Sequence, residues 1–335
     1  MILPYLMRIF GHIKMNNEIN EIGKSVIELQ IKALKKLKNS INASFNQAVN
    51  KIYKCKSKVI ICGVGKSGII ASKISATLSS VGTPSFSISA SDCSHGDLGR
   101  INKNDVLILI SNSGNTSELN NIIKFSKSNR IPLIGIVSNK NSNLYKSSDI
   151  KIFIPIVEES GFGIVPTSST TIQLSIGDAL SIALMKKKKF GKLDFKKFHP
   201  SGNLGNKLKI AEDLMITKKR IPFINENQKM KKALKILNDK RLGFLVITNK
   251  QGLTTGVFTD GDLKRLMQKK TKIDNLKIKS LMTKKPFKVE VNTLVTDVLA
   301  QMNKRKITNA CVYKNDNKKK TVGVLHIHHI LNNLR

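Results

Sequence analysis

The fold of this chain is decided at residues 59–68, VIICGVGKSG. A short apolar run ends there in a glycine turn, Gly63 to Gly68, and helical periodicity begins directly after it. Strand, turn and helix in that order form the basic unit of a parallel sheet. Further apolar runs alternate with helical stretches through the first half of the chain. The pattern predicts an α/β domain with a doubly wound parallel sheet, covered by helices on both faces.

The expected strands are 58–62, 84–89, 105–110, 132–137 and 150–155. The expected helices are about 67–80, 117–128 and 168–188, preceded by one or two helices within 18–54. In open sheets of this kind, ligands bind beyond the carboxyl ends of the strands. The loops at those ends are therefore the places to look for chemistry.

The glycine turn matches two nucleotide-binding patterns, and both are incomplete. Gly65-Lys66-Ser67 resembles the tail of a P-loop, but Ile60 stands where a P-loop needs its first glycine. The turn also fits the G-x-G-x-x-G of a dinucleotide site. That site needs an acidic residue at the end of the next strand, which ends at Ser89 without one. What remains is a helix start with bare N–H groups and a lysine, which suits a small anionic substrate.

Two hydroxyl-rich stretches also follow expected strands. SNSGNT (111–116) places Ser111, Ser113 and Thr116 around a glycine. One hydroxyl would be enough to cap a helix, whereas three around a glycine indicate a phosphate cradle. PTSSTT (166–171) opens a long helix, and helix capping alone explains it equally well.

The C-terminal part of the chain contains a tandem repeat. DLM at 213–215 recurs as SLM at 280–282, and GVFTDGDLKRLM at 256–267 recurs as GVLHIHHILNNL at 323–334. Both pairs are offset by 67 residues. A shared offset at the two ends of a unit is typical of a duplicated module. Each unit is expected to run strand, helix, strand, strand, helix.

The chain is strongly basic, with 58 Lys and Arg against 22 Asp and Glu, a net charge of +36. Such a charge could indicate a nucleic-acid partner. The lysines are spread along the chain, however, and aromatic residues make up only 5%. We therefore expect no nucleic-acid partner and attribute the charge to the compositional drift of an AT-rich genome.

The sequence contains no signal for a membrane or for secretion. No run of 18 apolar residues occurs, so we expect no membrane-spanning helix. The N-terminus lacks the ordered regions of a signal peptide, and Met15 is an alternative start. The four cysteines have neither metal-site nor disulfide spacing, so we expect buried or free thiols in a cytoplasmic protein.

Taken in order, several motifs resemble the sugar isomerase (SIS) domain of arabinose 5-phosphate isomerases. They are GVGKSG (63–68), SHGDLG (94–99), SNSGNTSE (111–118), PTSSTT (166–171), GDALSIAL (177–184) and HPSGNLG (199–205). The repeated tail resembles the pair of CBS domains that this family also carries. The implied domains are an N-terminal extension at 1–17, the SIS domain at 18–198, a linker at 199–212, and CBS domains at 213–270 and 278–335.

The resemblance implies an aldose–ketose isomerase that interconverts D-ribulose 5-phosphate and D-arabinose 5-phosphate through a cis-enediol. The aldose is a precursor of the lipopolysaccharide sugar Kdo. Neither a cofactor nor a metal is implied, because a carboxylate can move the proton between C1 and C2. A homotetramer is implied as well.

The site residues that the resemblance implies fall into three groups. The catalytic ones are Lys66, Glu118, Glu158 and His199, with Glu159 as the alternate of Glu158; the base is expected to be Glu158 or Glu118. The substrate-binding ones are Ser67, Gly82, Thr83, His95, Ser111, Ser113, Thr116 and Ser168. A nucleotide or nucleotide-sugar at the CBS pair would be held through Thr259 and Asp262, although the pair could equally serve oligomer packing alone.

Several positions depart from the family pattern. Asn115 replaces a glutamate after the S-N-S-G glycine, and Ser89 stands where a histidine is associated with inhibitory zinc. The family's E-A-C-P-L-G is EESGFG at 158–163, which has lost a cysteine and a proline, so we expect a looser loop. His329 replaces an aspartate, so repeat two should lack a nucleotide site.

Two other functions remain compatible with the sequence. The first is a phosphosugar-sensing regulator without catalysis, for which residues 1–54 offer too little for a full DNA-binding domain. The second is an isomerase of another sugar phosphate, such as a hexulose 6-phosphate or an amino sugar phosphate. The pentose enzyme is favoured over the second because of the CBS pair.

Overall fold

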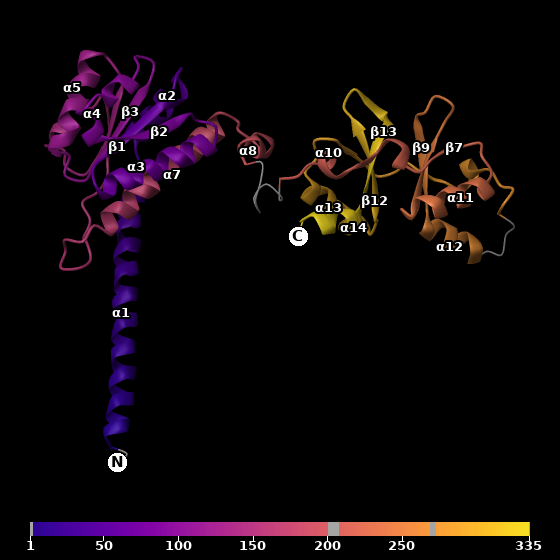
Figure 1. The fold of residues 1–335 in the computed structure, drawn as a ribbon, viewed down its shortest axis with the longest axis horizontal. Helices are drawn as coiled ribbons and strands as arrows, with labels where there is room; N and C mark the ends of the chain where they lie inside the picture. Colours follow the sequence, from indigo (N-terminus) through magenta and orange to yellow (C-terminus); the bar gives the residue numbers. More distant parts are fainter. Residues whose placement is uncertain (1–2, 200–207, 269–272, 335) are drawn as a thin grey trace. The chain divides into compact units, whose positions relative to one another are not determined.

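The computed structural model describes residues 3–199, 208–268 and 273–334; of residues 3–17, 317 and 318 only the backbone is described. The chain divides into two compact units, Met1–Phe195 and Lys196–Arg335 (Figure 1). No described helix is long and apolar enough to cross a membrane. All four cysteines are free thiols, and three of them are buried, which confirms the expectation of buried or free thiols.

The first unit is built on one five-stranded sheet in the order β2-β1-β3-β4-β5, with every pairing parallel. The strands are β1 (Val59–Gly63), β2 (Ser85–Ser89), β3 (Val106–Ser111), β4 (Leu133–Val137) and β5 (Ile150–Phe153). Each begins within a residue of its predicted start, and β5 ends two residues before its predicted end. The doubly wound fold class is confirmed.

The helices of this unit cover both faces of the sheet. They are α1 (Leu3–Ser40), α2 (Ala43–Tyr53), α3 (Lys66–Ser80), α4 (Ala90–Cys93), α5 (Asn120–Ser128), α6 (Asn143–Ser147) and α7 (Ser168–Lys187), with 3₁₀ turns η1 (Asp97–Arg100) and η2 (Ser117–Leu119). The helix predicted at 117–128 therefore begins as a 3₁₀ turn. Elements α4, α6 and η1 were not predicted, because they are too short to show a helical period.

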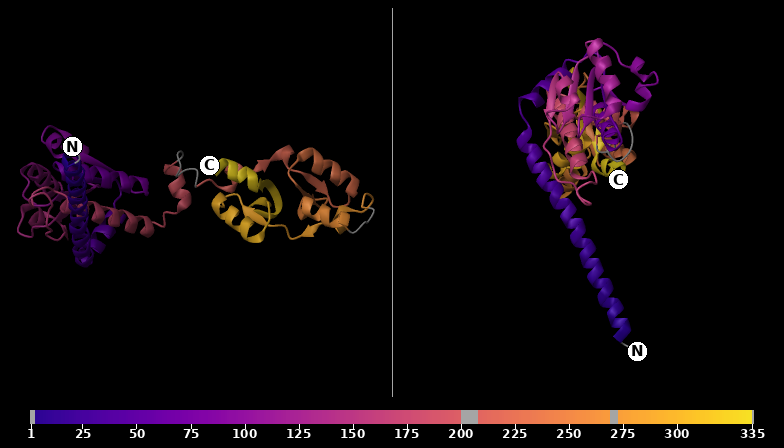
Figure 2. Two further views of the ribbon diagram at one scale, coloured as in Figure 1. Left: turned by 90° about the horizontal axis from the view of Figure 1, so that it is seen from below. Right: turned by 90° about the vertical axis from the view of Figure 1, so that its left-hand side faces the viewer.

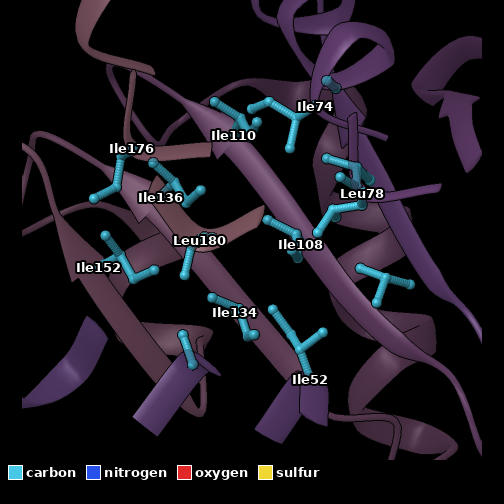
Figure 3. Packing of buried hydrophobic residues seen from close by; sticks show 14 of the residues in the cluster. Ile52, Ile74, Leu78, Ile108, Ile110, Ile134, Ile136, Ile152, Ile176 and Leu180 are labelled. Carbon is cyan, nitrogen blue, oxygen red and sulfur yellow. The ribbon is translucent and has the colours of Figure 1, made fainter. Parts of the chain in front are cut away.

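Two hydrophobic clusters lie on opposite sides of the sheet because neighbouring strand residues point to opposite faces. Ile61 and Ile108 pack under α1, α2, α3 and α7, whereas Ile60 and Leu107 pack under α4, α5 and α6. Figure 3 shows the first cluster, with β3, β4 and β5 isoleucines meeting side chains of α2, α3 and α7. A strand buried on both faces explains why the runs at 59–62 and 106–110 are continuously apolar.

Helix α1 is continuous across residue 17, where an N-terminal extension was expected to end. Its second half packs on the domain through Ala33 and Leu37, which are buried. Its first half stands clear of the sheet (Figures 1 and 2). A two-residue break then separates it from α2, so the two-helix option of the prediction is the correct one.

The second unit contains two copies of one module, and the predicted order of elements is confirmed in each. The first copy has β7 (Phe223–Asn225), α11 (Met230–Lys240), β8 (Phe244–Thr248), β9 (Thr254–Thr259) and α12 (Asp260–Gln268). The second has β11 (Lys288–Glu290), α13 (Val295–Arg305), β12 (Asn309–Lys314), β13 (Asn317–His326) and α14 (Ile327–Leu334). Helices α8 (Lys192–Phe198) and α10 (Ala211–Leu214) precede them.

The two copies exchange short strands, which was not predicted. β6 (Ile216–Thr217) pairs with β13 of the second copy, and β10 (Thr283–Lys284) pairs with β9 of the first. The hydroxyls of Thr254 and Thr321, 67 residues apart, lie 2.7 Å from each other. The sequence offset thus corresponds to a contact between equivalent positions of the two copies.

Candidate active site

The glycine turn at the carboxyl end of β1 brings the start of α3 close to the strand. A Cβ atom on Gly63 would lie 2.7 Å from the carbonyl group of Ser67, and one on Gly68 would lie 2.9 Å from the carbonyl oxygen of Gly63. Gly65 has a φ of +57°, which favours glycine. Lys66, the first residue of α3, is exposed beside this close contact.

The turn is tied to α7 by a hydrogen bond between side chains. The hydroxyl of Ser67 donates to Oε1 of Gln173, 3.1 Å away, and Gln173 is almost completely buried. Further along the two helices, Gly177 lets α7 approach α3, since a Cβ there would lie 2.3 Å from the side chain of Ile74. The first turn of α3 therefore lies beside the second turn of α7.

The hydroxyl loop follows β3, the neighbour of β1 in the sheet. Because Gly63 pairs with Ile110, the loop and the glycine turn leave the same edge. The hydroxyls of Ser111 and Thr116 are 2.8 Å apart, and that of Ser111 also accepts from the N–H of Gly114 at 3.0 Å. Ser111 is buried and Thr116 partly buried, while Ser113 is exposed. The hydroxyls of Ser111 and Thr116 therefore lie together, whereas that of Ser113 accepts from the N–H of Asn115 instead.

Packing beneath the loop fixes its shape. Gly114 has a φ of +69°, and a Cβ on it would lie 2.2 Å from the hydroxyl oxygen of Ser142. Asn115 stands where the family pattern has glutamate, and its Oδ1 accepts from the N–H of Asn143 at 2.9 Å. In this chain, Asn115 therefore ties the loop to the start of α6.

Glu118 lies in the 3₁₀ turn η2, directly after the hydroxyl loop, and is exposed. Its Oε2 accepts a hydrogen bond from the hydroxyl of Ser117 at 2.8 Å. Hydrogen bonds from its own backbone N–H and from Ser117 lower the pKa of Glu118, because they stabilise the carboxylate. This group is ionised over the whole neutral range.

Glu158 and Glu159 have different surroundings although they are adjacent. Glu158 is exposed and lines a hollow of about 300 Å³ with α1 residues that include Lys32 and Lys36. Glu159 instead caps α7, where its Oε2 accepts from the N–H groups of Thr167 and Ser168, each at 2.8 Å. The segment is tied at several points, so the expectation of a looser loop receives no support from these bonds.

Ser168, the first residue of α7, is fully buried. Its hydroxyl oxygen has no hydrogen-bond partner within the described part of the chain. Buried hydroxyls are nearly always paired, and an unpaired one needs an explanation. The oxygen has no access to solvent, however, so a ligand could reach it only after the start of α7 rearranges.

His95 lies in an exposed turn that follows β2 and α4, at the same carboxyl edge. The turn is joined to α5 through Ser94, whose hydroxyl accepts from Asn121 at 3.2 Å. Ser89, at the end of β2, caps α4 by accepting from the N–H of Asp92. This turn therefore extends toward the helix that follows Glu118.

Gly82 and Thr83 are not part of this cluster within the chain. They precede β2, and Ser85 pairs with Val59 at the amino end of β1, so they lie at the opposite edge of the sheet. Lys188 donates to the carbonyl oxygen of Gly82 at 2.9 Å and to the hydroxyl of Thr83 at 2.8 Å. Burial lowers the pKa of Lys188.

His199 follows α8, and its N–H donates to the carbonyl oxygen of Lys196 at 3.2 Å. Because residues from Lys196 onward belong to the second unit, His199 is described with that unit and not with the cluster around Lys66. The remainder of its motif, 200–205, lies outside the described residues.

At the CBS pair, Thr259 and Asp262 bond to each other at the start of α12. Oδ2 of Asp262 accepts from the N–H of Thr259 at 2.9 Å and from its hydroxyl at 2.8 Å, and Oδ1 accepts from Arg265. In the second copy the equivalent segment carries His326, whose pKa is lowered by burial and by the neighbouring His328 and His329.

Sequence reasoning did not foresee the role of Gln173, which accepts from Ser67, or that of Glu159. Gln173 gave no signal, because it is one polar residue within a helix. Glu159 was considered only as a substitute for Glu158, whereas the structure gives it its own partners at the start of α7. Glu159 stands only eight residues before Thr167, which is compatible with a contact to the start of α7. Whether the loop folds back far enough to make that contact cannot be read from the sequence.

Comparisons with known proteins agree with this arrangement. The SIS domain family matches residues 51–183, and the CBS domain family matches residues 211–269 and 278–335. The arabinose 5-phosphate isomerase KdsD of Yersinia pestis is 38% identical over 316 residues, which cover 94% of this chain and 95% of that protein. KdsD of Escherichia coli K12 is 37% identical over 316 residues, with the same coverage.

Two further similarities are of interest. An uncharacterized protein of Rickettsia prowazekii, RP505, is 37% identical over 318 residues, which cover 94% of this chain and 97% of that protein. Among solved structures, the protein c3406 of Escherichia coli CFT073 in complex with arabinose 5-phosphate is similar, with a TM-score of 0.54 and 38% identity. That match covers 55% of this chain and 99% of the other.

Proposed function

The chain belongs to the arabinose 5-phosphate isomerase family, and we propose that it interconverts D-ribulose 5-phosphate and D-arabinose 5-phosphate. One observation carries the proposal. Lys66 and the hydroxyl loop 111–116 lie at the carboxyl ends of two adjacent parallel strands, and Glu118 follows that loop. Backbone N–H groups, hydroxyls, a cation and carboxylates at one edge suit a small phosphorylated sugar.

The hydroxyl loop would hold the phosphate group of the substrate. Ser111, Ser113 and Thr116 would supply hydroxyl donors to the phosphate oxygens. Ser67 and His95 would contact the sugar oxygens. In this arrangement binding relies on neutral donors, and Lys66 is left to act at the reacting end.

The reaction moves a proton between C1 and C2 of the open-chain sugar through an enediolate. It needs a base for that proton and a positive charge for the enediolate oxygen. We assign the charge to Lys66. We favour Glu158 over Glu118 as the base, because the hydroxyl of Ser117 already occupies one carboxylate oxygen of Glu118 at 2.8 Å. His199 would assist ring opening.

Purified protein with D-ribulose 5-phosphate in deuterated water and EDTA, followed by proton NMR, tests this proposal. Signals of D-arabinose 5-phosphate with deuterium at C2 are expected. Binding without conversion would instead indicate a phosphosugar sensor. Absence of binding would direct the search to hexulose 6-phosphates and amino sugar phosphates.

We also propose that the chain forms a homotetramer and that α1 provides one of the interfaces between its copies. Helix α1 exposes apolar side chains on one side, among them Ile19 (58% exposed), Ile22 (63%) and Ile27 (55%). Charges are unevenly distributed along the described side chains of the helix: residues 18–28 carry three glutamates and one lysine (Glu18, Glu21, Glu28 and Lys24), whereas residues 32–38 carry four lysines and no acidic residue. Antiparallel pairing of two copies would cover the apolar side and set the acidic part of each helix against the basic part of the other.

A second copy would also account for Gly82 and Thr83. The resemblance assigns them to the substrate, but they lie at the opposite edge of their own sheet. In an assembly, that edge can face the site of a neighbouring copy.

The remaining proposals follow from the family. They are a supply of precursor for Kdo and lipopolysaccharide synthesis, a cytoplasmic location, and a nucleotide or nucleotide-sugar held at Thr259 and Asp262 of the CBS pair.

A further inference from the structure

We propose that Glu159 is a positioning residue for the isomerase reaction, because its carboxylate anchors the 158–166 loop to the start of α7 and thereby holds Glu158 in place. The inference rests on the proposed function, in which Glu158 is the base. It concerns a residue that the family pattern does not use, since E-A-C-P-L-G has alanine at this position and EESGFG has Glu159.

The anchor consists of several hydrogen bonds to one carboxylate. Oε2 of Glu159 accepts from the N–H groups of Thr167 and Ser168 at 2.8 Å, and from the hydroxyl of Thr167 at 3.2 Å. The N–H of Ser169 lies 3.3 Å from each carboxylate oxygen. The hydroxyl of Thr167 in turn accepts from the N–H of Ser160 at 3.1 Å, so both ends of the loop are joined.

Electrostatics favour the anchor. The first N–H groups of a helix lack partners within the helix, and the positive end of the helix dipole attracts an anion. Partial burial of Glu159 opposes its ionisation, but hydrogen bonds from Ser169, Thr167 and Ser168 outweigh that effect and lower the pKa of Glu159. The carboxylate is therefore charged, and bound to α7, throughout the pH range in which an isomerase would work.

The loop closes on itself through the N–H groups of Ile164 and Val165, which donate to Gly161 and Ser160 at 3.2 Å, but these bonds do not reach α7. The turn that they close is strained. Gly161, Phe162 and Gly163 have φ values of +58°, +61° and +75°. A left-handed conformation is costly for phenylalanine, and Phe162 is fully exposed, so packing does not hold it there. Proline would have restricted the unfolded loop, but glycine stands at 161 instead. We infer that Glu159 offsets the lost proline and cysteine of the family motif.

Glu159 affects catalysis because it is the direct neighbour of Glu158, the proposed base. Glu158 precedes the anchor by one residue and is exposed, and its side chain borders the hollow beside α1. Its position therefore depends on the backbone that Glu159 holds. A base displaced by about 1 Å loses on the order of a hundredfold in rate. Release of Glu159 should therefore reduce kcat, while the phosphate-binding loop and hence KM stay nearly unchanged.

The experiment compares Glu159→Ala and Glu159→Gln with wild type. We expect kcat to fall at least tenfold in the alanine variant and less in the glutamine variant, which keeps one acceptor oxygen, with KM within about twofold in each. Asp149→Asn is the matched control, because Asp149 also accepts a backbone N–H bond, from Leu133 at 2.8 Å, but at the opposite edge of the sheet. Its kcat should equal that of wild type.

Amide hydrogen exchange supplies a readout that does not depend on activity. The N–H groups of Thr167, Ser168 and Ser169 should exchange faster in Glu159→Ala than in wild type. Unchanged exchange rates would show that Glu159 does not anchor the loop. Faster exchange with an unchanged kcat would show that Glu159 only caps α7 and does not position the base. If wild type does not convert the sugar, the proposed function fails, and the role of Glu159 in catalysis fails with it, whereas the exchange data still decide whether the anchor exists.

Discussion

The hydroxyl of Ser67 donates a hydrogen bond to Oε1 of Gln173 across 3.1 Å, and this contact joins the start of α3 to the second turn of α7 although the two residues are 106 positions apart in the chain. It fixes the glycine turn that carries Lys66 against the helix that carries Ser168. The candidate site therefore has two walls, the α3 turn and the start of α7, connected by a buried amide. Several of the following predictions test these walls and the loops attached to them.

Gln173→Leu should weaken the site without removing a substrate contact. The variant leaves the Ser67 hydroxyl without its acceptor, and loss of a partly buried partner costs about 1–3 kcal/mol. We expect a lower free energy of unfolding by urea denaturation and a loss in kcat/KM of about tenfold, because the Lys66 turn loses its fixed position. Asn129→Ala, which removes a bond to the carbonyl of Phe125 at the end of α5, should lower stability only. Equal kcat/KM in Gln173→Leu and wild type would contradict this role.

Gly114→Ala should disrupt the hydroxyl loop. The new Cβ would collide with Ser142 in a backbone conformation, φ +69°, that disfavours side chains, at a cost of about 1–3 kcal/mol or more. We expect a lower melting temperature and a higher KM for the sugar phosphate. Gly99→Ala is the control, since a Cβ there has no atom within 4 Å. The prediction is wrong if the two alanine variants behave alike.

Lys66→Ala should affect catalysis without affecting stability. The side chain is exposed, so the free energy of unfolding should stay near the wild-type value. If its charge stabilises the enediolate, kcat should fall by roughly a hundredfold or more. Lys103→Ala, another exposed lysine of the same unit, should keep full activity. A small loss in the Lys66 variant, similar to that of Lys103→Ala, would remove Lys66 from the mechanism.

The anchor of Glu159 should make stability depend on pH in a defined direction. Folding lowers the pKa of Glu159 from its usual value of 4.5. Its contribution is therefore complete above about pH 4.5 and is lost as the pH falls through the lowered pKa. The difference in the free energy of unfolding between wild type and Glu159→Gln should be largest near neutral pH and shrink in more acidic solution. A difference that is constant with pH would show that the carboxylate charge is not involved.

Disruption of the exposed side of α1 should dissociate the assembly. Ile22→Glu combined with Ile27→Glu places charges where the pairing of two copies needs apolar contacts. Analytical ultracentrifugation should show a smaller particle than wild type, with lower activity if a neighbouring copy completes the site. Met267→Glu, at a similarly exposed apolar residue of α12, should leave the mass unchanged. An unchanged mass in the double variant would exclude α1 as the interface.

Much of the architecture could be predicted from local patterns. Continuous apolar runs such as 106–110 identify strands buried on both faces, and glycine turns mark their ends. The 67-residue offset identifies the duplicated module, because equal units repeat equal patterns. The exchange of β6 and β10 could not be predicted, since two-residue strands have no period and the choice of sheet edge depends on packing between the copies.

The sequence by itself determined which loops lie together at one edge of the sheet, because parallel strands send their carboxyl ends to the same edge and the residues that follow each strand are known. Only the tertiary structure decided how adjacent residues divide their roles. Glu158 and Glu159 have the same side chain, but the start of α7 takes the carboxylate of Glu159 and leaves Glu158 exposed. Likewise Gly82 and Thr83 carry a family motif, yet the register of β2 on β1 sets them at the far edge. Both outcomes depend on contacts between segments that are distant in the chain, which local sequence does not encode.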